Sequence, residues 1–113
     1  MAYTEATARV LDALGDPTRR AVLELLRGGP QPVGELASHL PVSRPAVSQH
    51  LRVLKEAGLV QDRQDGTRRL YRVDTDGLSA LRTYLESFWG TALTRFEAAA
   101  TAESRRTEGG RER

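Results

Sequence analysis

The chain has 113 residues, a formal net charge of +2 at pH 7 and no cysteine. This length suits one compact domain and is too short for two separate cores, and the lack of cysteine excludes disulfides, thiolate nucleophiles and cysteine-based metal sites. Because no apolar run is long enough for a membrane span and no secretion signal is recognisable, we expect a cytoplasmic protein without a membrane partner.

The positive charge is concentrated in the middle of the chain. Residues 44–72 carry a net charge of +4, whereas the segments before and after them each carry −1. Such a local excess is typical of a surface that binds a polyanion. An ordinary solvated face would show the same charge, so the interpretation depends on the elements that carry it.

Two helices are predicted at the start of the chain. Apolar spacing from Thr4 to Leu14 indicates the first, which Gly15 ends. Asp16 then provides an N-cap, followed by proline in the first helical position, for a second helix that runs to Gly28.

A helix-turn-helix is predicted next. After a rigid connector at Pro30–Pro32, the apolar face of residues 33–40 indicates a short helix that Pro41 ends. Ser43 caps a longer helix that runs to Gly58, with apolar side chains inward and polar side chains outward. A short helix, a three-residue turn and a longer helix with a polar outer face together form this motif.

A β-hairpin is predicted after the fourth helix. Residues 59–63 and 68–73 are expected to be strands around an Asp65-Gly66 turn, with arginines clustered beside the turn. Directly behind a helix-turn-helix, such a hairpin is interpreted as a wing. The fold class predicted is mainly α with a β-hairpin wing, a winged helix-turn-helix of five helices and two strands.

A fifth helix carries most of the aromatic residues. The apolar stripe from Leu78 to Phe96 predicts about five turns, and Tyr84 and Trp89 broaden the stripe. A small domain has little core to cover so wide a stripe, which therefore needs a partner. We assign residues 1–100 to the domain and expect residues 101–113, which lack large apolar side chains, to form a disordered polar tail.

The fourth helix and the wing hold the candidate contacts to double-stranded DNA. The second helix of a helix-turn-helix enters the major groove, where Arg44 suits guanine and Gln49 suits adenine. Wing arginines would bind phosphates or a narrow minor groove. For both groups, a merely solvated surface is the alternative. The predicted contacts are Ser43, Arg44, Pro45, Ser48, Gln49, Arg52, Lys55, Arg63, Arg68, Arg69 and Arg72.

Several runs of residues together resemble the ArsR-type winged-helix transcriptional regulators. They are LGDPTRR at 14–20, VGELA at 33–37, SRPAVSQHLRVLKEAGLV at 43–60 and the wing sequence GTRRLY at 66–71. The resemblance implies a homodimer joined through the first and last helices, bound to a palindromic operator with its reading helices about one duplex turn apart. The expected interface residues are Val10, Leu14, Leu81, Leu85, Phe88, Trp89 and Phe96.

Many ArsR-type regulators sense metals, but this chain lacks the residues of both known kinds of site. The segment Glu35–Leu40, where some members carry a cysteine-containing site, has no soft ligand. The last helix has no histidine to pair with its carboxylates. We therefore predict no metal and no cofactor, with a carboxylate/histidine site across the dimer left open.

The predicted function is a sequence-specific, DNA-binding transcriptional regulator, with repression as the expected outcome. Whether binding represses or activates depends on where the operator lies relative to the promoter. An enzyme is not expected, because the chain has no Gly-rich phosphate loop, nucleophile elbow or paired-carboxylate motif. The alternative is a protein-interaction module or co-regulator whose signal comes from a separate sensor protein.

Overall fold

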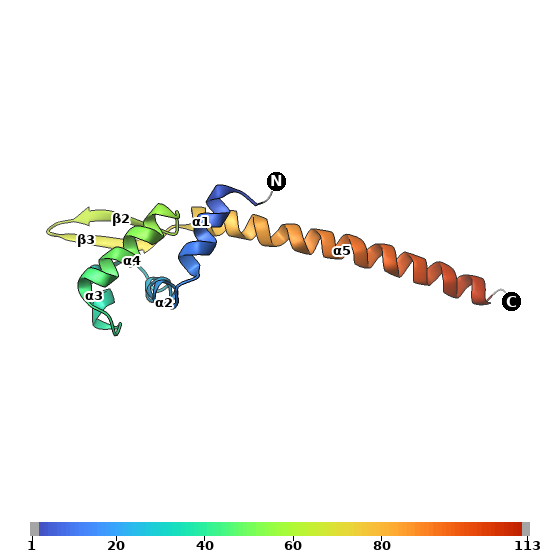
Figure 1. Ribbon diagram of the computed structural model, residues 1–113, viewed down its shortest axis with the longest axis horizontal. Coiled ribbons are helices and arrows are strands. Elements are labelled where there is room, and N and C mark those ends of the chain that lie inside the picture. Colours follow the sequence, from blue (N-terminus) through green and yellow to red (C-terminus); the bar gives the residue numbers. More distant parts are fainter. Residues whose placement is uncertain (1–2, 112–113) are drawn as a thin grey trace.

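The computed structural model describes the backbone of residues 3–111 and the side chains of residues 3–103. In this range a small helical domain carries a β-hairpin on one side and a long helix on the other (Figure 1). The elements, in chain order, are α1 Glu5–Leu14, α2 Pro17–Leu26, β1 Gln31–Pro32, α3 Val33–Ser38, α4 Arg44–Glu56, β2 Val60–Asp65, β3 Arg68–Val73 and α5 Thr75–Arg111.

The helix starts confirm the N-caps expected from the sequence. The Asp16 carboxylate accepts a hydrogen bond of 2.9 Å from the Arg19 backbone N–H at the start of α2. The Ser43 hydroxyl accepts one of 3.2 Å from the Ala46 N–H at the start of α4. Each bond satisfies a backbone donor that has no partner within its own helix, so these residues fix where the helices begin.

The sheet has one strand more than the sequence predicted. The described strands form an antiparallel sheet in the order β1-β3-β2, in which Gln31 pairs with Tyr71 and Pro32 with Leu70. The predicted connector is therefore strand β1. Two residues are too few for a period-two signal, and proline is tolerated there because β1 is an edge strand.

The hairpin turn is tighter than the sequence indicated. Asp65 pairs with Arg68, so β2 extends two residues past its predicted end and only two residues make the turn. Gly66, at the first of these positions, has φ 63°, a value that glycine adopts without the cost paid by other residues.

One apolar core holds the helix-turn-helix against α1, α2 and the sheet. Its members are fully or almost fully buried and come from every helix except α5 and from the segment where β2 begins, while Tyr71 and Val73 of β3 are partly buried against them. Burying each such side chain contributes about 1.5–3 kcal/mol relative to exposing it. The buried core residues are Val10, Ala13, Val22, Leu26, Leu36, Val47, Leu51, Leu54, Leu59 and Val60.

A close backbone contact sets the direction in which α5 leaves the domain. The Gly77 N–H donates to the Gly58 carbonyl at 2.8 Å, and Gly58 itself has φ 76°. A Cβ at Gly77 would lie 2.7 Å from that carbonyl oxygen, closer than side-chain carbons normally approach. Glycine at position 77 therefore lets the first turn of α5 pack directly onto the end of α4.

Helix α5 is longer than the helix predicted from the apolar stripe, which covers Leu78 to Phe96. It reaches Arg111 and gives the molecule an extent of 80 × 26 × 22 Å (Figure 1). Residues 98–106 are mostly alanine, glutamate and arginine, which favour helix even without an apolar face. The domain boundary near residue 100 and the disordered tail at 101–113 stay predictions, and residues 112–113 lie outside the described range.

None of the helices in the described part of the chain combines the length and apolar character needed to cross a membrane.

Candidate nucleic-acid interface

The outward face of α4 is exposed along its whole length. Ser48, Gln49 and Arg52 are exposed, as are Arg44 and Pro45 at the start of the helix. Their spacing of three and four residues places them on one stripe of an α-helix. The structure therefore presents the side chains that the sequence predicted would face a nucleic acid, with nothing in the described chain packed over them.

The inward face of α4 fixes this orientation. Val47, Leu51 and Leu54 are each at most 1% exposed and pack in the core with Leu36 of α3. Rotating α4 to bury its polar stripe would expose these three side chains. Because large-to-small changes in a core typically cost 2–5 kcal/mol, exposing all three would cost more than a small domain's margin of stability.

The wing is tied to the end of α4 by an ion-pair cluster. The Asp62 carboxylate on β2 lies 2.7 Å from the Lys55 ammonium of α4 and 2.7 Å from the Arg69 guanidinium of β3. Its side chain is 7% exposed, whereas both cations are about half exposed. The hydrogen bond from Lys55, with that from Arg69, holds the pKa of Asp62 below its ordinary value.

This cluster offsets two of the predicted DNA-binding charges, a feature that the sequence reasoning missed. Asp62→Asn should raise the affinity for both specific and random duplexes severalfold, because it removes a carboxylate from between two phosphate-facing cations. Fluorescence anisotropy titrations at several salt concentrations would measure this. The matched control is Asp65→Asn, which makes the same change of charge at an exposed aspartate beside the wing turn that takes part in no ion pair within residues 3–103. Equal or weaker binding by Asp62→Asn would show that the ion pairs serve to orient the wing.

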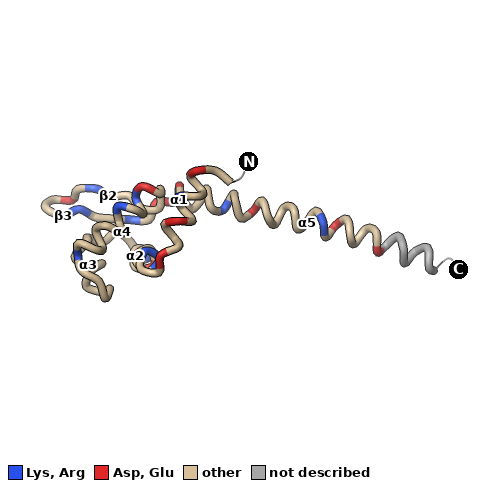
Figure 2. Tube along the Cα trace, in the orientation of Figure 1, with Lys and Arg blue, Asp and Glu red and all other residues tan. Residues whose placement is uncertain are grey.

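The remaining predicted cations form no ion pair within the described side chains. Arg72 donates to the amide oxygen of Gln61 at 2.7 Å and interacts electrostatically with the Asp74 carboxylate. Within residues 3–103, Arg44, Arg52, Arg63 and Arg68 form no ion pair. The basic positions gather on α4 and the two wing strands, at the end of the molecule away from α5 (Figure 2). This end is therefore an exposed cationic surface.

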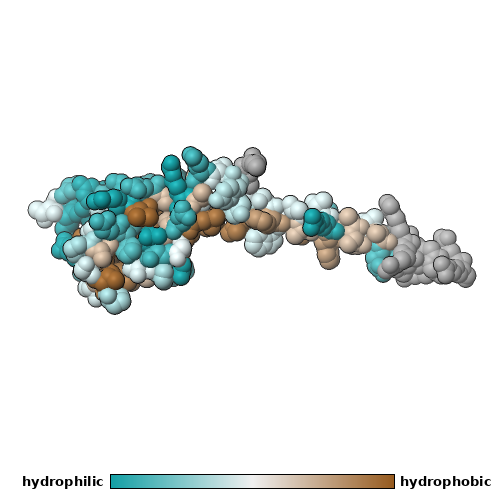
Figure 3. Space-filling view, in the orientation of Figure 1, coloured by the Kyte–Doolittle hydropathy of each residue, from teal (hydrophilic) through white to brown (hydrophobic). Residues whose placement is uncertain are grey.

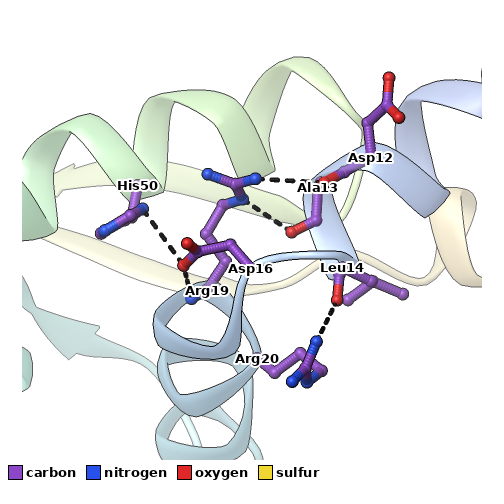
Figure 4. Close-up of polar contacts among 7 residues, drawn as sticks. All are labelled: Asp12, Ala13, Leu14, Asp16, Arg19, Arg20 and His50. Carbon is purple, nitrogen blue, oxygen red and sulfur yellow. Dashed lines mark hydrogen bonds and ion pairs between the residues drawn. The ribbon is translucent and has the colours of Figure 1, made fainter.

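The turn between α1 and α2 contacts α4 through Asp16 and His50 (Figure 4). The Arg19 side chain donates to the Ala13 carbonyl at 2.7 Å, and Arg20 donates to the Leu14 carbonyl at 2.7 Å, so both satisfy the end of α1. The Asp16 carboxylate that caps α2 also lies 3.9 Å from the His50 Nδ1 of α4. The turn thus connects α1, α2 and α4.

The Asp16 cap predicts a defined response to acid. The Arg19 backbone N–H, aided by His50, lowers the pKa of Asp16 below its ordinary value of 3.8. A carboxylate with a lowered pKa stabilises the fold above pH 3.8 and loses that contribution as the pH falls through its folded-state pKa. Asp16→Ala should therefore lower Tm at pH 7, and the difference from the parent protein should shrink below pH 3.8.

Thermal unfolding followed by circular dichroism between pH 2.5 and 7 would test this expectation. Asp16→Asn is the matched control, because its amide oxygen still accepts the N-cap hydrogen bond and it should lose less stability than the alanine variant. A Tm difference that stays constant across the range would contradict the role assigned to the carboxylate.

An apolar stripe runs along α5 away from the domain (Figure 3). Leu85, Phe88, Trp89 and Phe96, all predicted interface residues, are 40–71% exposed. Tyr84 makes edge contacts with Phe88 and Tyr3, with ring centroids 5.0 and 5.1 Å apart. These rings leave much of the stripe uncovered, so the described chain does not supply a partner for it.

The predicted interface is corrected at one position and qualified at two. Val10 is completely buried in the core of its own chain, because α1 turns this side toward α2 and α4, so it has no surface for a partner. Leu14 and Leu81 are partly buried against the same core. Two further exposed apolar side chains were not among the predicted interface residues: Tyr3, which contacts Tyr84 of α5, and Leu11 of α1.

The described residues hold no group of three or more histidine, cysteine, aspartate or glutamate side chains placed to bind a metal ion. The two histidines lie on different elements: His39 is exposed at the end of α3, and His50 is partly buried against Asp16.

This geometry suits a duplex nucleic acid. The major groove of B-DNA is about 12 Å wide and admits one α-helix, whose exposed polar side chains reach the base edges. The wing arginines lie beside α4, where the phosphate backbone would run. A helix that reads bases and a cationic hairpin that binds phosphates are the two parts that a winged helix-turn-helix needs.

Comparison with known proteins agrees with this interpretation. Residues 16–62, which span α2, the helix-turn-helix and the start of the wing, match the family model described as bacterial regulatory protein, arsR family. Over 86 residues the chain is 64% identical to the HTH-type transcriptional regulator Rv2034 of Mycobacterium tuberculosis, covering 76% of this chain and 80% of that one.

Two further relatives extend the comparison. The transcriptional repressor SdpR of Bacillus subtilis is 37% identical over 79 residues, covering 70% of this chain and 88% of that one. The homodimeric winged helix-turn-helix DNA-binding domain Mb0332 of Mycobacterium bovis superposes with a TM-score of 0.61 at 32% identity, covering 84% of this chain and 80% of that one. The chain belongs to the ArsR family of bacterial regulatory proteins.

Proposed function

We propose that the protein is a sequence-specific, DNA-binding transcriptional repressor that acts in the cytoplasm, where the bacterial chromosome lies. The observation that carries this proposal is the exposed polar stripe of α4 beside four arginines that form no ion pair within residues 3–103, namely Arg44, Arg52, Arg63 and Arg68. Family membership supports it, and the relative SdpR is named a transcriptional repressor. A bound regulator of this size represses by occupying the operator that a promoter overlaps.

Each part of the surface has its own role in this proposal. Gln49 and Ser48 read base edges in the major groove, with Pro45 making apolar contact and Arg52 binding phosphate one turn further along. The wing cations supply affinity that depends on salt and little on sequence. This division follows from position, since α4 carries the exposed polar stripe and the two wing strands carry Arg63, Arg68, Arg69 and Arg72.

The functional unit in this proposal is a homodimer. The exposed apolar residues of α5 are the contact surface, and a second copy of α5 is the partner that matches them in chemistry. The relative Mb0332 is described as homodimeric, which supports this assembly. Two reading helices related by a two-fold axis would recognise a palindromic operator with half-sites about 34–36 Å apart.

Selection of bound duplexes from a random pool tests the proposal. The expected result is one palindromic sequence, enriched equally with and without added zinc, nickel or copper. A reporter gene with that sequence across its promoter should then be less active when the protein is expressed. A pool that stays random after selection would contradict DNA reading and favour a protein-interaction module.

A further inference from the structure

A cleft separates the wing from the helix-turn-helix. It has a volume of about 520 Å³, and its walls come from the start of α3, the first residue of α4 and the wing side of β3. β1 pairs only with Leu70 and Tyr71, so it ends before reaching Arg68 and Arg69. The short length of β1 therefore leaves this stretch of the β3 edge open to the cleft.

Arg44 lines this cleft and also belongs to the exposed polar stripe of α4. Its guanidinium packs against the α3 residue Gly34, where a Cβ would come within 3.8 Å of the terminal nitrogen. The same guanidinium lines the cleft together with Thr67, Arg68 and Arg69 of the wing. Arg44 therefore borders both the exposed polar stripe of α4 and the cleft.

The charge of the cleft favours an anion. Three arginines line it against one carboxylate, that of Glu35. Arg69 already pairs with Asp62, whereas the side chains of Arg44 and Arg68 form no hydrogen bond or ion pair among residues 3–103. Two guanidiniums without an ion pair, one from α4 and one from the wing, leave several N–H donors that a phosphate can accept from through charge-assisted hydrogen bonds.

We propose that this cleft holds one backbone phosphate of the operator in each half-site, bound between Arg44 and Arg68. The inference rests on the proposed function and changes one assignment within it: Arg44 binds phosphate, whereas the sequence predicted that it reads guanine. The cleft lies between the reading helix and the wing, so a phosphate bound there would fix the position of both on the duplex.

Arg44→Ala and Gln49→Ala separate phosphate binding from base reading. Anisotropy titrations against the selected operator and a scrambled duplex should show that Arg44→Ala weakens both by the same factor, about tenfold. Its salt dependence should also flatten by about 0.9 units of log affinity per log salt for each phosphate that the variant no longer binds. Gln49→Ala should instead weaken mainly the operator.

Methylphosphonate substitution locates the phosphate itself. Replacing operator phosphates one at a time by this neutral analogue should identify one position per half-site that weakens the parent protein about tenfold and Arg44→Ala less than twofold. Inorganic phosphate at constant ionic strength should compete only weakly with the operator. A free anion makes only the contacts of the cleft, whereas the operator is also bound by α4 and the wing. Equal losses for the parent and Arg44→Ala at every position would overturn the proposal.

Two variants control the charge change. Glu35→Gln, which removes the one carboxylate of the cleft, should tighten binding to both duplexes. Arg82→Ala removes a cation from α5 that pairs with Glu86 of the same helix and does not line the cleft, so it should change neither. If Arg44→Ala lowers only operator affinity, with an unchanged salt slope, the cleft assignment fails while the proposed function stands. If the parent protein itself prefers no duplex, both fail.

Discussion

Replacing Gln49 with alanine should lower the ratio of operator to scrambled-duplex affinity by roughly 5- to 160-fold, which corresponds to about 1–3 kcal/mol for one bidentate base contact. Gln49 is exposed in the second turn of α4, on the side opposite the buried Val47, Leu51 and Leu54. Its amide can donate and accept at the same time, as recognition of an adenine edge requires. The loss should fall on the operator, because the scrambled duplex offers no matching base.

Gln64→Ala is the matched control for this experiment. Gln64 is also an exposed glutamine, but it lies on the wing and donates to the Gly66 carbonyl at 2.9 Å. Its removal should leave the affinity ratio unchanged. If Gln49→Ala leaves the ratio unchanged as well, the base-reading role belongs to another residue of the stripe.

Replacing Trp89 with aspartate should convert the protein to a monomer. Trp89 is 61% exposed on α5, so the substitution breaks no core packing within the chain. In a dimer, however, it would bury a charge in an apolar interface, which the protein cannot compensate by pairing. Operator affinity should fall by about 10²- to 10⁴-fold, because the two half-sites would no longer be bound by linked domains.

Sedimentation velocity and anisotropy on the same samples would measure both effects. Thr94→Asp introduces the same charge away from the apolar stripe of α5, since five residues at 100° each place it about 140° around the helix from Trp89. That variant should stay dimeric, and both should keep the far-UV circular dichroism spectrum of the folded domain. A dimer that survives Trp89→Asp would show that the α5 stripe is not the contact surface.

Local signals in the sequence were sufficient to predict most of the fold. The N-caps at Asp16 and Ser43, the glycine stops and the apolar spacing act within a few residues of chain, so the sequence alone locates all five helices and the hairpin. Strand β1 could not be predicted in this way. It exists only because β3, about forty residues later, offers an edge to pair with.

The site residues divide in the same way. That Ser48, Gln49 and Arg52 face outward follows from helical periodicity, which the sequence carries. That Asp62 lies between Lys55 and Arg69 depends on how the wing folds back beside α4, and Val10 is buried because of how α1 meets α2 and α4. Such contacts between distant segments leave no periodic pattern to recognise.

The most direct test of the account is the equilibrium preference of the unmodified protein for its selected operator over a scrambled duplex, measured by anisotropy at moderate ionic strength. An exposed polar side of α4, beside a wing whose Arg63 and Arg68 form no ion pair within residues 3–103, predicts a preference of about 10³-fold or more. Equal affinity for the two duplexes would mean that the polar side of α4 does not read bases, and would contradict the account.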